Sequence, residues 1–185
     1  MEEQEHKPIT VLRLGHRPSR DKRVSTHLLL AARAFGARDA IYTGIKDVTL
    51  EESVSKIVKE WGGDFSVEYS ESWKKTLRAW KGKIIHLTMY GLPVEDVIDE
   101  IKDDLFPKLV IVGGAKVPGD LYGMADWNVA VTNQPHSEVS ALALFLHELY
   151  CGKELSLNFP GAKLTVVPQA NTKKVIPRAI HMSNK

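Results

Sequence analysis

The chain has 185 residues, of which 43% are hydrophobic and 26% charged, and its formal net charge is +2. These values suit a globular protein with one hydrophobic core and exclude a disordered or fibrous chain. The single cysteine, Cys151, excludes an intramolecular disulfide framework, and no segment has the length and apolarity of a signal peptide or membrane span. We therefore expect a cytoplasmic protein with one domain over residues 1–185 and a short C-terminal extension from about residue 152.

Short apolar runs typical of buried strands alternate with helical patterns along the chain. The expected strands cover residues 9–14, 40–42, 65–69, 83–87, 108–112, 127–131 and 164–167. Helical spacing of apolar residues predicts helices from about residue 25 to 35 and over residues 50–61, 73–81, 94–105 and 139–150. This alternation indicates an α/β fold with a mainly parallel sheet flanked by helices.

A glycine-rich loop over residues 113–120 follows one of the expected strands. It lacks the Gly-Lys-Ser/Thr ending of a P-loop and the G-x-G-x-x-G fingerprint of dinucleotide sites. Gly113 and Gly114 would allow the backbone to approach a ligand closely, because no Cβ stands in the way. The same residues also suit a plain turn between a strand and a helix, and the loop alone leaves both interpretations open.

A polar loop over residues 132–138 follows the next expected strand. Ser137 fits the N-cap of the following helix and Glu138 fits its first turn, which explains both residues without a ligand. Neighbours in sequence cannot face one another as a catalytic triad requires, so His136, Ser137 and Glu138 are not one. Because both loops follow the ends of what we expect to be neighbouring strands, they indicate a pocket built largely from backbone.

The helix expected at 139–150 is apolar on nearly every side. Such a helix is buried all round, either in the core or against a partner subunit. His147 and Glu148 lack the second histidine of a zinc-protease helix, so we expect no metal site there.

Basic residues concentrate in two segments. One helix carries Trp73, Leu77 and Trp80 on the face expected in the core, and another face carries Lys74, Arg78 and Lys81. The other segment is a loop before the first helix with Arg17, Arg20, Lys22 and Arg23. Arginine suits bidentate contacts with phosphate, so we expect this loop to bind anions.

The two C-terminal loops, within VIVGGAKVPGDLY and NVAVTNQPHSEVSALALFLHELY, together resemble the cofactor half of the SPOUT RNA methyltransferases. With the N-terminal HRPSRDKRVSTHLLLAARAFGA, the resemblance narrows to the archaeal family that methylates the ribose of cytidine-56 in tRNA, and it covers about residues 9–168. It implies a SPOUT-like fold with a deep C-terminal trefoil knot, a homodimer, S-adenosyl-L-methionine as cofactor and tRNA as substrate. It implies no DNA or membrane partner.

The resemblance also implies the cofactor-binding residues. They lie at the end of one strand and in the two loops: Leu87, Gly113, Gly114, Ala115, Lys116, Val117, Val131, Thr132, Asn133, Gln134, Pro135, His136, Ser137 and Glu138.

One position departs from the pattern of the wider class. Many ribose-directed SPOUT enzymes carry an arginine about six residues before the glycine that closes their first motif, and here that position is Leu30. We expect Arg23, with Arg20 behind it, to be the catalytic arginine, and we expect RNA contacts from Arg17, Arg20, Lys22, Arg23, Lys74 and Arg78. A guanidinium cannot serve as a base, so it would clamp phosphate and orient the hydroxyl. His27 and a substrate phosphate are both candidate proton acceptors.

Two other functions remain open from the residues alone. One is an RNA-binding module without catalysis, which the sequence does not separate from an enzyme. A nucleotide-binding oxidoreductase or transferase of doubly wound type needs a glycine fingerprint after the first strand. There the chain offers only Gly15, followed by His16, Arg17 and Pro18.

Overall fold

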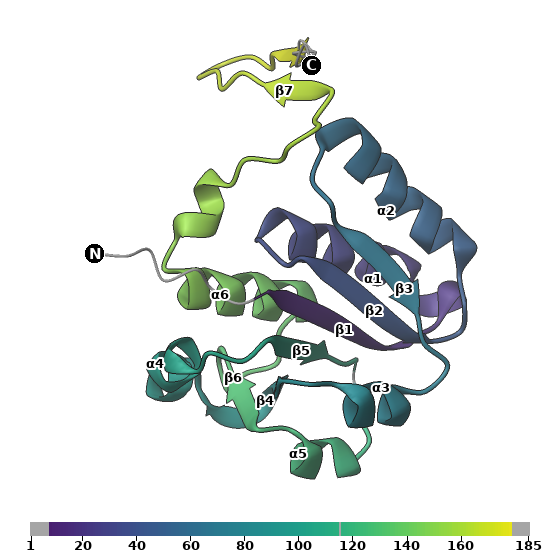
Figure 1. The fold of residues 1–185 in the computed structure, drawn as a ribbon, viewed down its shortest axis with the longest axis vertical. Coiled ribbons are helices and arrows are strands. Elements are labelled where there is room, and N and C mark those ends of the chain that lie inside the picture. The colour runs from purple at the N-terminus through teal and green to yellow at the C-terminus, as the bar shows by residue number, and fades with distance from the viewer. Residues whose placement is uncertain (1–7, 115, 179–185) are drawn as a thin grey trace.

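The computed structural model describes residues 8–114 and 116–178, apart from the side chain of Lys22. Within these ranges, six strands form one parallel sheet in the order β3-β2-β1-β5-β4-β6 (Figure 1). They are β1 (Ile9–His16), β2 (Asp39–Gly44), β3 (Ser66–Tyr69), β4 (Lys83–Pro93), β5 (Lys108–Val112) and β6 (Trp127–Ala130). The predicted α/β fold with a parallel sheet flanked by helices is confirmed.

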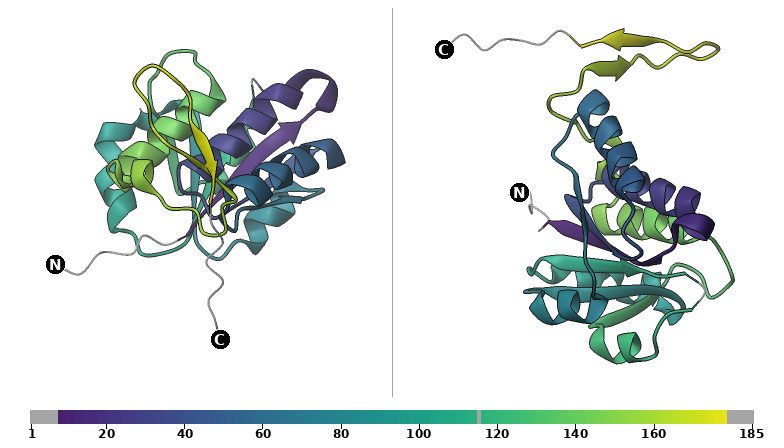
Figure 2. Two further views of the ribbon diagram at one scale, coloured as in Figure 1. Left: turned by 90° about the horizontal axis from the view of Figure 1, so that it is seen from above. Right: turned by 90° about the vertical axis from the view of Figure 1, so that its right-hand side faces the viewer.

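Helices cover both faces of the sheet (Figure 2). One face packs against α1 (Pro18–Ala34), α2 (Val48–Trp61), α4 (Val94–Asp103) and α6 (Glu138–Tyr150). The other face packs against the shorter α3 (Trp73–Ala79) and α5 (Asp120–Met124). Because strand side chains alternate, Val11 lies in the larger core beneath α1 and α6, and Leu12 lies in the smaller core.

The basic segment before the first predicted helix is itself helical, so its assignment as a loop was wrong. Helix α1 begins at Pro18, about two turns before the predicted start at Ser25. Proline suits the first helical position because its φ is already helical, and Asp21 lies in the first turn, where a carboxylate interacts favourably with the helix dipole. Arg20 and Arg23 therefore lie on a helix surface.

The expectation that the two ligand loops follow neighbouring strands was also wrong. Strand β4 lies between β5 and β6, so three strand ends meet at this edge of the sheet. Strand β4 also runs beyond its predicted end at Leu87, and Leu87 and Leu92 both pair with Val129. Gly91 permits this irregularity, because a Cβ there would lie 2.5 Å from the main-chain nitrogen of Val129. The order of strands in space is not encoded in local apolar patterns.

Glycines follow the carboxyl ends of the first two helices. Gly36 follows the C-cap of α1 with a φ of 90°, and Gly62 caps α2 with a φ of 78°. Glycine adopts such left-handed conformations without a steric penalty.

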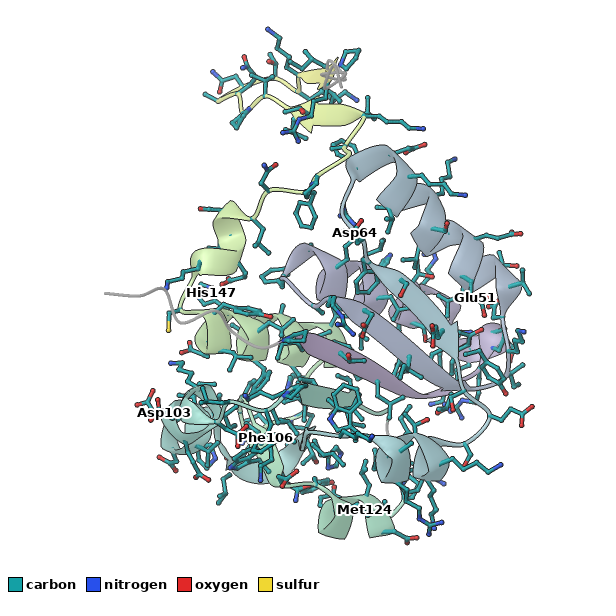
Figure 3. All side chains as sticks on the ribbon, viewed as in Figure 1. Glu51, Asp64, Asp103, Phe106, Met124 and His147 are labelled. Atoms are coloured by element: carbon teal, nitrogen blue, oxygen red, sulfur yellow. The ribbon has the colours of Figure 1, made fainter. Side chains whose placement is uncertain are left out.

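After α6 the chain forms η1 (Lys153–Ser156) and an antiparallel hairpin of β7 (Leu164–Val166) and β8 (Val175–Pro177). The hairpin stands away from the main sheet, beyond the end of α2 (Figures 1 and 2). The predicted strand at 164–167 is confirmed to within one residue, whereas β8 is exposed and gave no pattern of burial to recognise. Figure 3 shows His147 near the carboxyl end of α6, where its Nδ1 lies 2.6 Å from Oε1 of the buried Glu154.

Candidate functional site

A cavity of about 400 Å³ lies where β4, β5 and β6 end. This volume lies within the range of about 300–1,000 Å³ that is typical of small-molecule sites. The lining residues are His86, Leu87, Thr88, Met89, Tyr90, Val112, Gly113, Gly114, Val117, Tyr122, Val129, Val131, Pro135, His136, Ser137, Glu138 and Ala141.

Most of the expected cofactor-binding residues line this cavity. They are Leu87, Gly113, Gly114, Val117, Val131, Pro135, His136, Ser137 and Glu138. Four others lie in the same two loops without being part of its lining: Lys116, Thr132, Asn133 and Gln134. Ala115 lies outside the described residues. The structure therefore brings both loops to one cavity, with the end of β4 between them.

Asn133 connects two of the chain segments that form the cavity. Its side-chain Nδ2 donates to the carbonyl oxygens of Met89 at 2.7 Å and Gly91 at 3.1 Å. These bonds join the loop after β6 to the irregular part of β4. The side chain of Asn133 thus links two segments of the protein and is not itself part of the cavity lining.

The glycine loop is folded back closely on itself. A Cβ at Gly113 would lie 2.4 Å from Cγ2 of Val117, which also lines the cavity. The plain alternative of a turn into a helix is partly right as well, because the short helix α5 begins at Asp120. The loop serves both as a connection and as a wall of the cavity.

The first turn of α6 forms another part of the wall. Ser137 is the N-cap, as predicted, and its Oγ accepts a hydrogen bond of 3.3 Å from the main-chain nitrogen of Val139. Glu138 lies in the first turn and lines the cavity. Of the residues that the structure describes along this lining, Glu138 is the one carboxylate.

Behind Glu138 lies Arg13, which our sequence analysis missed. Arg13 points from β1 toward α1 and α6, is only 1% exposed, and its Nη1 lies 3.8 Å from Oε1 of Glu138. Burial lowers the pKa of the guanidinium, and the neighbouring carboxylates of Glu138 and Asp21 oppose that shift. The available signal was a charged residue inside the apolar run TVLRL, since such residues are rarely buried without a partner.

A buried chain of hydrogen bonds extends from Arg13 to the start of α2. Arg13 Nε donates to Ser25 Oγ at 3.4 Å, and that oxygen lies 2.8 Å from His16 Nδ1. His16 Nε2 lies 3.2 Å from Oδ2 of Asp47. A carboxylate only accepts, so Nε2 carries a hydrogen. Because Ser25 and His16 are fully buried, this serine is no accessible nucleophile.

His86 presents a second buried polar group at the cavity. The side-chain Nδ2 of Asn128 donates to the carbonyl of Tyr122, which leaves Oδ1 of Asn128 to accept from His86 Nδ1 at 2.8 Å. His86 Nε2 is then an acceptor, and it has no partner among the residues that the structure describes. Burial lowers the pKa of His86, which favours the neutral ring.

None of the expected catalytic and RNA-binding cations whose side chains the structure describes lines the cavity. Arg17, Arg20 and Arg23 are exposed where α1 begins, and Arg17 Nε donates to Asp21 at 3.0 Å. This helix starts at the same sheet edge as the cavity, because it directly follows the carboxyl end of β1. On α3, Lys74 pairs with Asp120 and Arg78 is exposed, while Leu77 is buried as predicted.

The described part of the chain offers no alternative metal centre and no membrane-spanning helix. No group of three histidine, cysteine, aspartate or glutamate side chains within it could hold a metal ion. None of its helices combines the length and the apolar character needed to cross a bilayer.

Sequence comparison gives extensive matches to proteins of one family. Residues 61–176 match the family described as "tRNA ribose 2'-O-methyltransferase, aTrm56". A relative from Methanothermobacter thermautotrophicus is 54% identical over 168 residues, covering 89% of this chain and 94% of that protein. One from Thermococcus kodakarensis is 54% identical over 175 residues, covering 92% and 97%. Both are named "tRNA (cytidine(56)-2'-O)-methyltransferase".

Solved structures share the fold at much lower sequence identity. The TrmH/SpoU tRNA modifying enzyme of A. aeolicus gives a TM-score of 0.59 at 13% identity, covering 80% of this chain and 77% of that chain. The SpoU methyltransferase AviRb from Streptomyces viridochromogenes, solved in complex with the cofactor AdoMet, gives 0.56 at 18% identity, covering 81% and 59%.

Proposed function

Because this chain belongs to the tRNA ribose 2′-O-methyltransferase family, we propose that it methylates the ribose 2′-oxygen of cytidine-56 in tRNA. The methyl donor is S-adenosyl-L-methionine. The observation that carries the proposal is the cavity at the ends of β4, β5 and β6, whose lining includes most of the residues implied by the family's motifs. Membership of this family argues against the oxidoreductase alternative.

The chemistry of the cavity fits this donor. Gly113 and Gly114 leave main-chain groups accessible to a ligand. The wall of the cavity also contains many apolar side chains that suit a nucleoside. When bound, S-adenosylmethionine supplies a methyl group activated by a positively charged sulfur.

The protein's own contribution is chiefly to hold two substrates in line. Alignment alone can supply about 7–11 kcal/mol of the barrier when the reacting atoms are well oriented. The leaving thioether is neutral, so no acid is needed on that side. We propose that Arg23, with Arg20 behind it, clamps substrate phosphate and orients the hydroxyl, with further RNA contacts from Arg17, Lys22, Lys74 and Arg78.

We also propose the assembly and topology that the family resemblance implies: a deep C-terminal trefoil knot and a homodimer, acting on tRNA in the cytoplasm. Support for the dimer comes from α6, where Leu144 is 51% exposed between the exposed Ser140 and Glu148. Most of the apolar side chains of α6 lie in the protein's own core, so the surface left for a partner is a narrow stripe. We treat residues 1–185 as one domain with an extension from about residue 152.

A labelled-methyl assay tests the function directly. We expect incubation with labelled S-adenosylmethionine and unmodified tRNA to place label on the ribose of cytidine-56. Label in no nucleotide, or label that survives replacement of cytidine-56, contradicts the proposal. An RNA-binding module without catalysis would instead give no heat with S-adenosylmethionine in calorimetry.

A further inference from the structure

We propose that Glu138 accepts the proton of the ribose 2′-hydroxyl and that Arg13 positions its carboxylate. The inference rests on the proposed function and assigns a step that the sequence left open between His27 and a substrate phosphate. It follows from the placement of a single carboxylate on the cavity wall, with a buried guanidinium directly behind it.

The carboxylate of Glu138 is accessible and not committed elsewhere. Its side chain is 29% exposed, and Oε1 lies 3.6 Å from where a Cβ on Gly114 would stand. Within residues 8–114 and 116–178, no hydrogen bond to this carboxylate is formed. Its lone pairs are therefore available to a hydroxyl that enters the cavity.

Arg13 holds this carboxylate by charge. The distance of 3.8 Å from Nη1 to Oε1 exceeds a hydrogen bond, and Nη1 has no other partner among the described residues. A buried polar group without a partner lowers stability, so its retention needs a reason. An attraction that fixes Glu138 while leaving its oxygens free supplies that reason.

The chain of hydrogen bonds behind Arg13 restricts the guanidinium itself. Nε is directed at Ser25, which is held in turn by His16 and Asp47. All of these residues are buried. Arg13 is therefore a positioning residue whose orientation is set by β1, α1 and the start of α2.

The other titratable groups near the cavity are less suited to this step. His27 is exposed on α1 and is not part of the cavity lining. His86 Nε2 has almost no accessible surface, and His136 is exposed with its Nδ1 donating to Gln134 at 2.6 Å. The remaining titratable groups on the wall, Tyr90 and Tyr122, carry hydroxyls that are themselves protonated donors.

The step balances without a further reactant. The ribose 2′-oxygen forms a bond to the methyl carbon as the carbon–sulfur bond breaks, and that electron pair goes to sulfur. The hydroxyl proton passes to the Glu138 carboxylate, which becomes a carboxylic acid and later returns the proton to water.

The first test is Glu138→Gln, which keeps the shape of the side chain and removes its charge. In single turnovers with saturating tRNA and donor, we expect a rate loss of about 100-fold or more, the usual worth of a general base. The residual rate should rise about tenfold per pH unit between about pH 6 and about pH 9, because hydroxide must then remove the proton. Affinity for S-adenosylhomocysteine, measured by calorimetry, should stay within about threefold. Glu52→Gln on the exposed face of α2, away from the cavity, is the control and should match the wild type.

Double variants test whether Arg13 acts through Glu138. Arg13→Lys keeps a charge but loses the bond to Ser25, and we expect it to slow turnover in the wild-type background. Combined with Glu138→Gln, Arg13→Lys should cause no further loss of rate. The effects of substituting two residues that act as a unit are not additive. Should Arg13→Lys fail to fold, Ser25→Ala tests the same coupling, since it removes the acceptor of Arg13 Nε together with the partner of His16 Nδ1.

The outcomes that overturn the inference are distinct from failure of the proposed function. Parallel losses of S-adenosylhomocysteine affinity and rate in Glu138→Gln would make Glu138 a ligand-binding residue. A pH-dependent rate in His136→Asn, with Glu138→Gln fully active, would assign the proton to His136. Additive losses of rate in the double variant would show that Arg13 does not act through Glu138. A wild-type protein that leaves cytidine-56 unmethylated contradicts the proposed function itself.

Discussion

The side-chain Nδ2 of Asn133 donates to the carbonyl oxygen of Met89 at 2.7 Å, and this bond fastens the loop after β6 to the end of β4. With the second bond to Gly91, the side chain holds together two segments that enclose the cavity. The cavity therefore depends on a residue that is not part of its lining.

Replacing Asn133 by alanine should weaken donor binding without unfolding the protein. Each lost hydrogen bond is worth about 0.5–1.5 kcal/mol, so we expect the Kd for S-adenosylhomocysteine to rise roughly tenfold. Calorimetry measures this change. Asn171→Ala in the exposed hairpin is the control. An unchanged Kd in Asn133→Ala would mean that the loop after β6 and the end of β4 hold their positions without these bonds.

Gly113→Ala should also impair the cavity, for a steric reason. The added Cβ would lie 2.4 Å from Cγ2 of Val117, so the loop or the side chain must move. We expect roughly a tenfold weaker Kd for S-adenosylhomocysteine, equivalent to about 1.4 kcal/mol. Gly119→Ala in the same loop is a close control, since nothing lies within 4 Å of its added Cβ. Equal affinities of the two variants would count against a tightly folded loop.

Arg23→Ala should separate RNA contacts from donor binding. Arg23 is exposed on α1 and does not line the cavity. We expect turnover to fall by about 100-fold or more while the Kd for S-adenosylhomocysteine is nearly unchanged, because a clamp on substrate acts through alignment. Methyl transfer and calorimetry on the same preparation give both values. A loss in both would instead indicate a role in folding or in the pocket.

Arg33→Met should destabilise the protein and loosen its C-terminal extension. The buried Arg33 donates from Nη2 to the carbonyls of Trp61 at 2.9 Å and Gly62 at 2.7 Å, and it lies 4.4 Å from the ring centre of Phe159. Hydrogen bonds from charged groups contribute about 1.5–3 kcal/mol each, so we expect a loss of about 3 kcal/mol in unfolding free energy. Urea denaturation measures it, and proteolysis after residue 157 should accelerate.

The exposed Arg38 provides the control for that change. Its pair with Asp39 is at the surface, where ion pairs contribute about 0–1 kcal/mol. Arg38→Met should therefore unfold near the wild-type urea concentration. Similar losses in both arginine variants would show that charge, and not the contacts of Arg33, accounts for the effect.

Asp47→Asn should produce a stability loss that depends on pH. Burial acts to raise the pKa of Asp47, but bonds from His16, Leu50 and Thr49 outweigh it, so the folded pKa lies below the ordinary value. A lowered pKa stabilises the fold above the unfolded value of about 3.9, and this contribution is lost as pH falls through the folded pKa.

The difference between wild type and Asp47→Asn should therefore be about 1–2 kcal/mol at neutral pH and should shrink as the pH falls from about 5 to about 3. Urea unfolding across this range measures it. Asp103, labelled in Figure 3, is exposed on α4, and Asp103→Asn should show no such trend. A difference that is constant with pH would assign the effect to helix capping alone.

Much of the fold was predictable because its buried strands appear in the sequence as short apolar runs. Strand β5 was predicted with its observed bounds, and the capping role of Ser137 followed from residue type and position. The start of α1 was missed because a run of cations looks alike on a loop and on a solvated helix. Pro18 and Asp21 were the signals that would have placed it.

The candidate site was only partly predictable. Its glycine loop and the cap of α6 were found from local residue types, whereas the contact between Arg13 and Glu138 joins residues far apart in the sequence. The position of β4 between β5 and β6 is likewise a property of the sheet as a whole. Such juxtapositions arise from long-range packing, which no window of the sequence contains.

The strand order has a consequence for how the protein acquires activity during synthesis. Strand β4 is made before both of its neighbours, and the last wall of the cavity comes from the loop and helix that follow β6. Long-range pairings of this kind form late because chain entropy must be lost first. A nascent chain that ends before α6 contains all six strands of the sheet but lacks one wall of the donor site, so binding competence is among the last properties that the growing polypeptide gains.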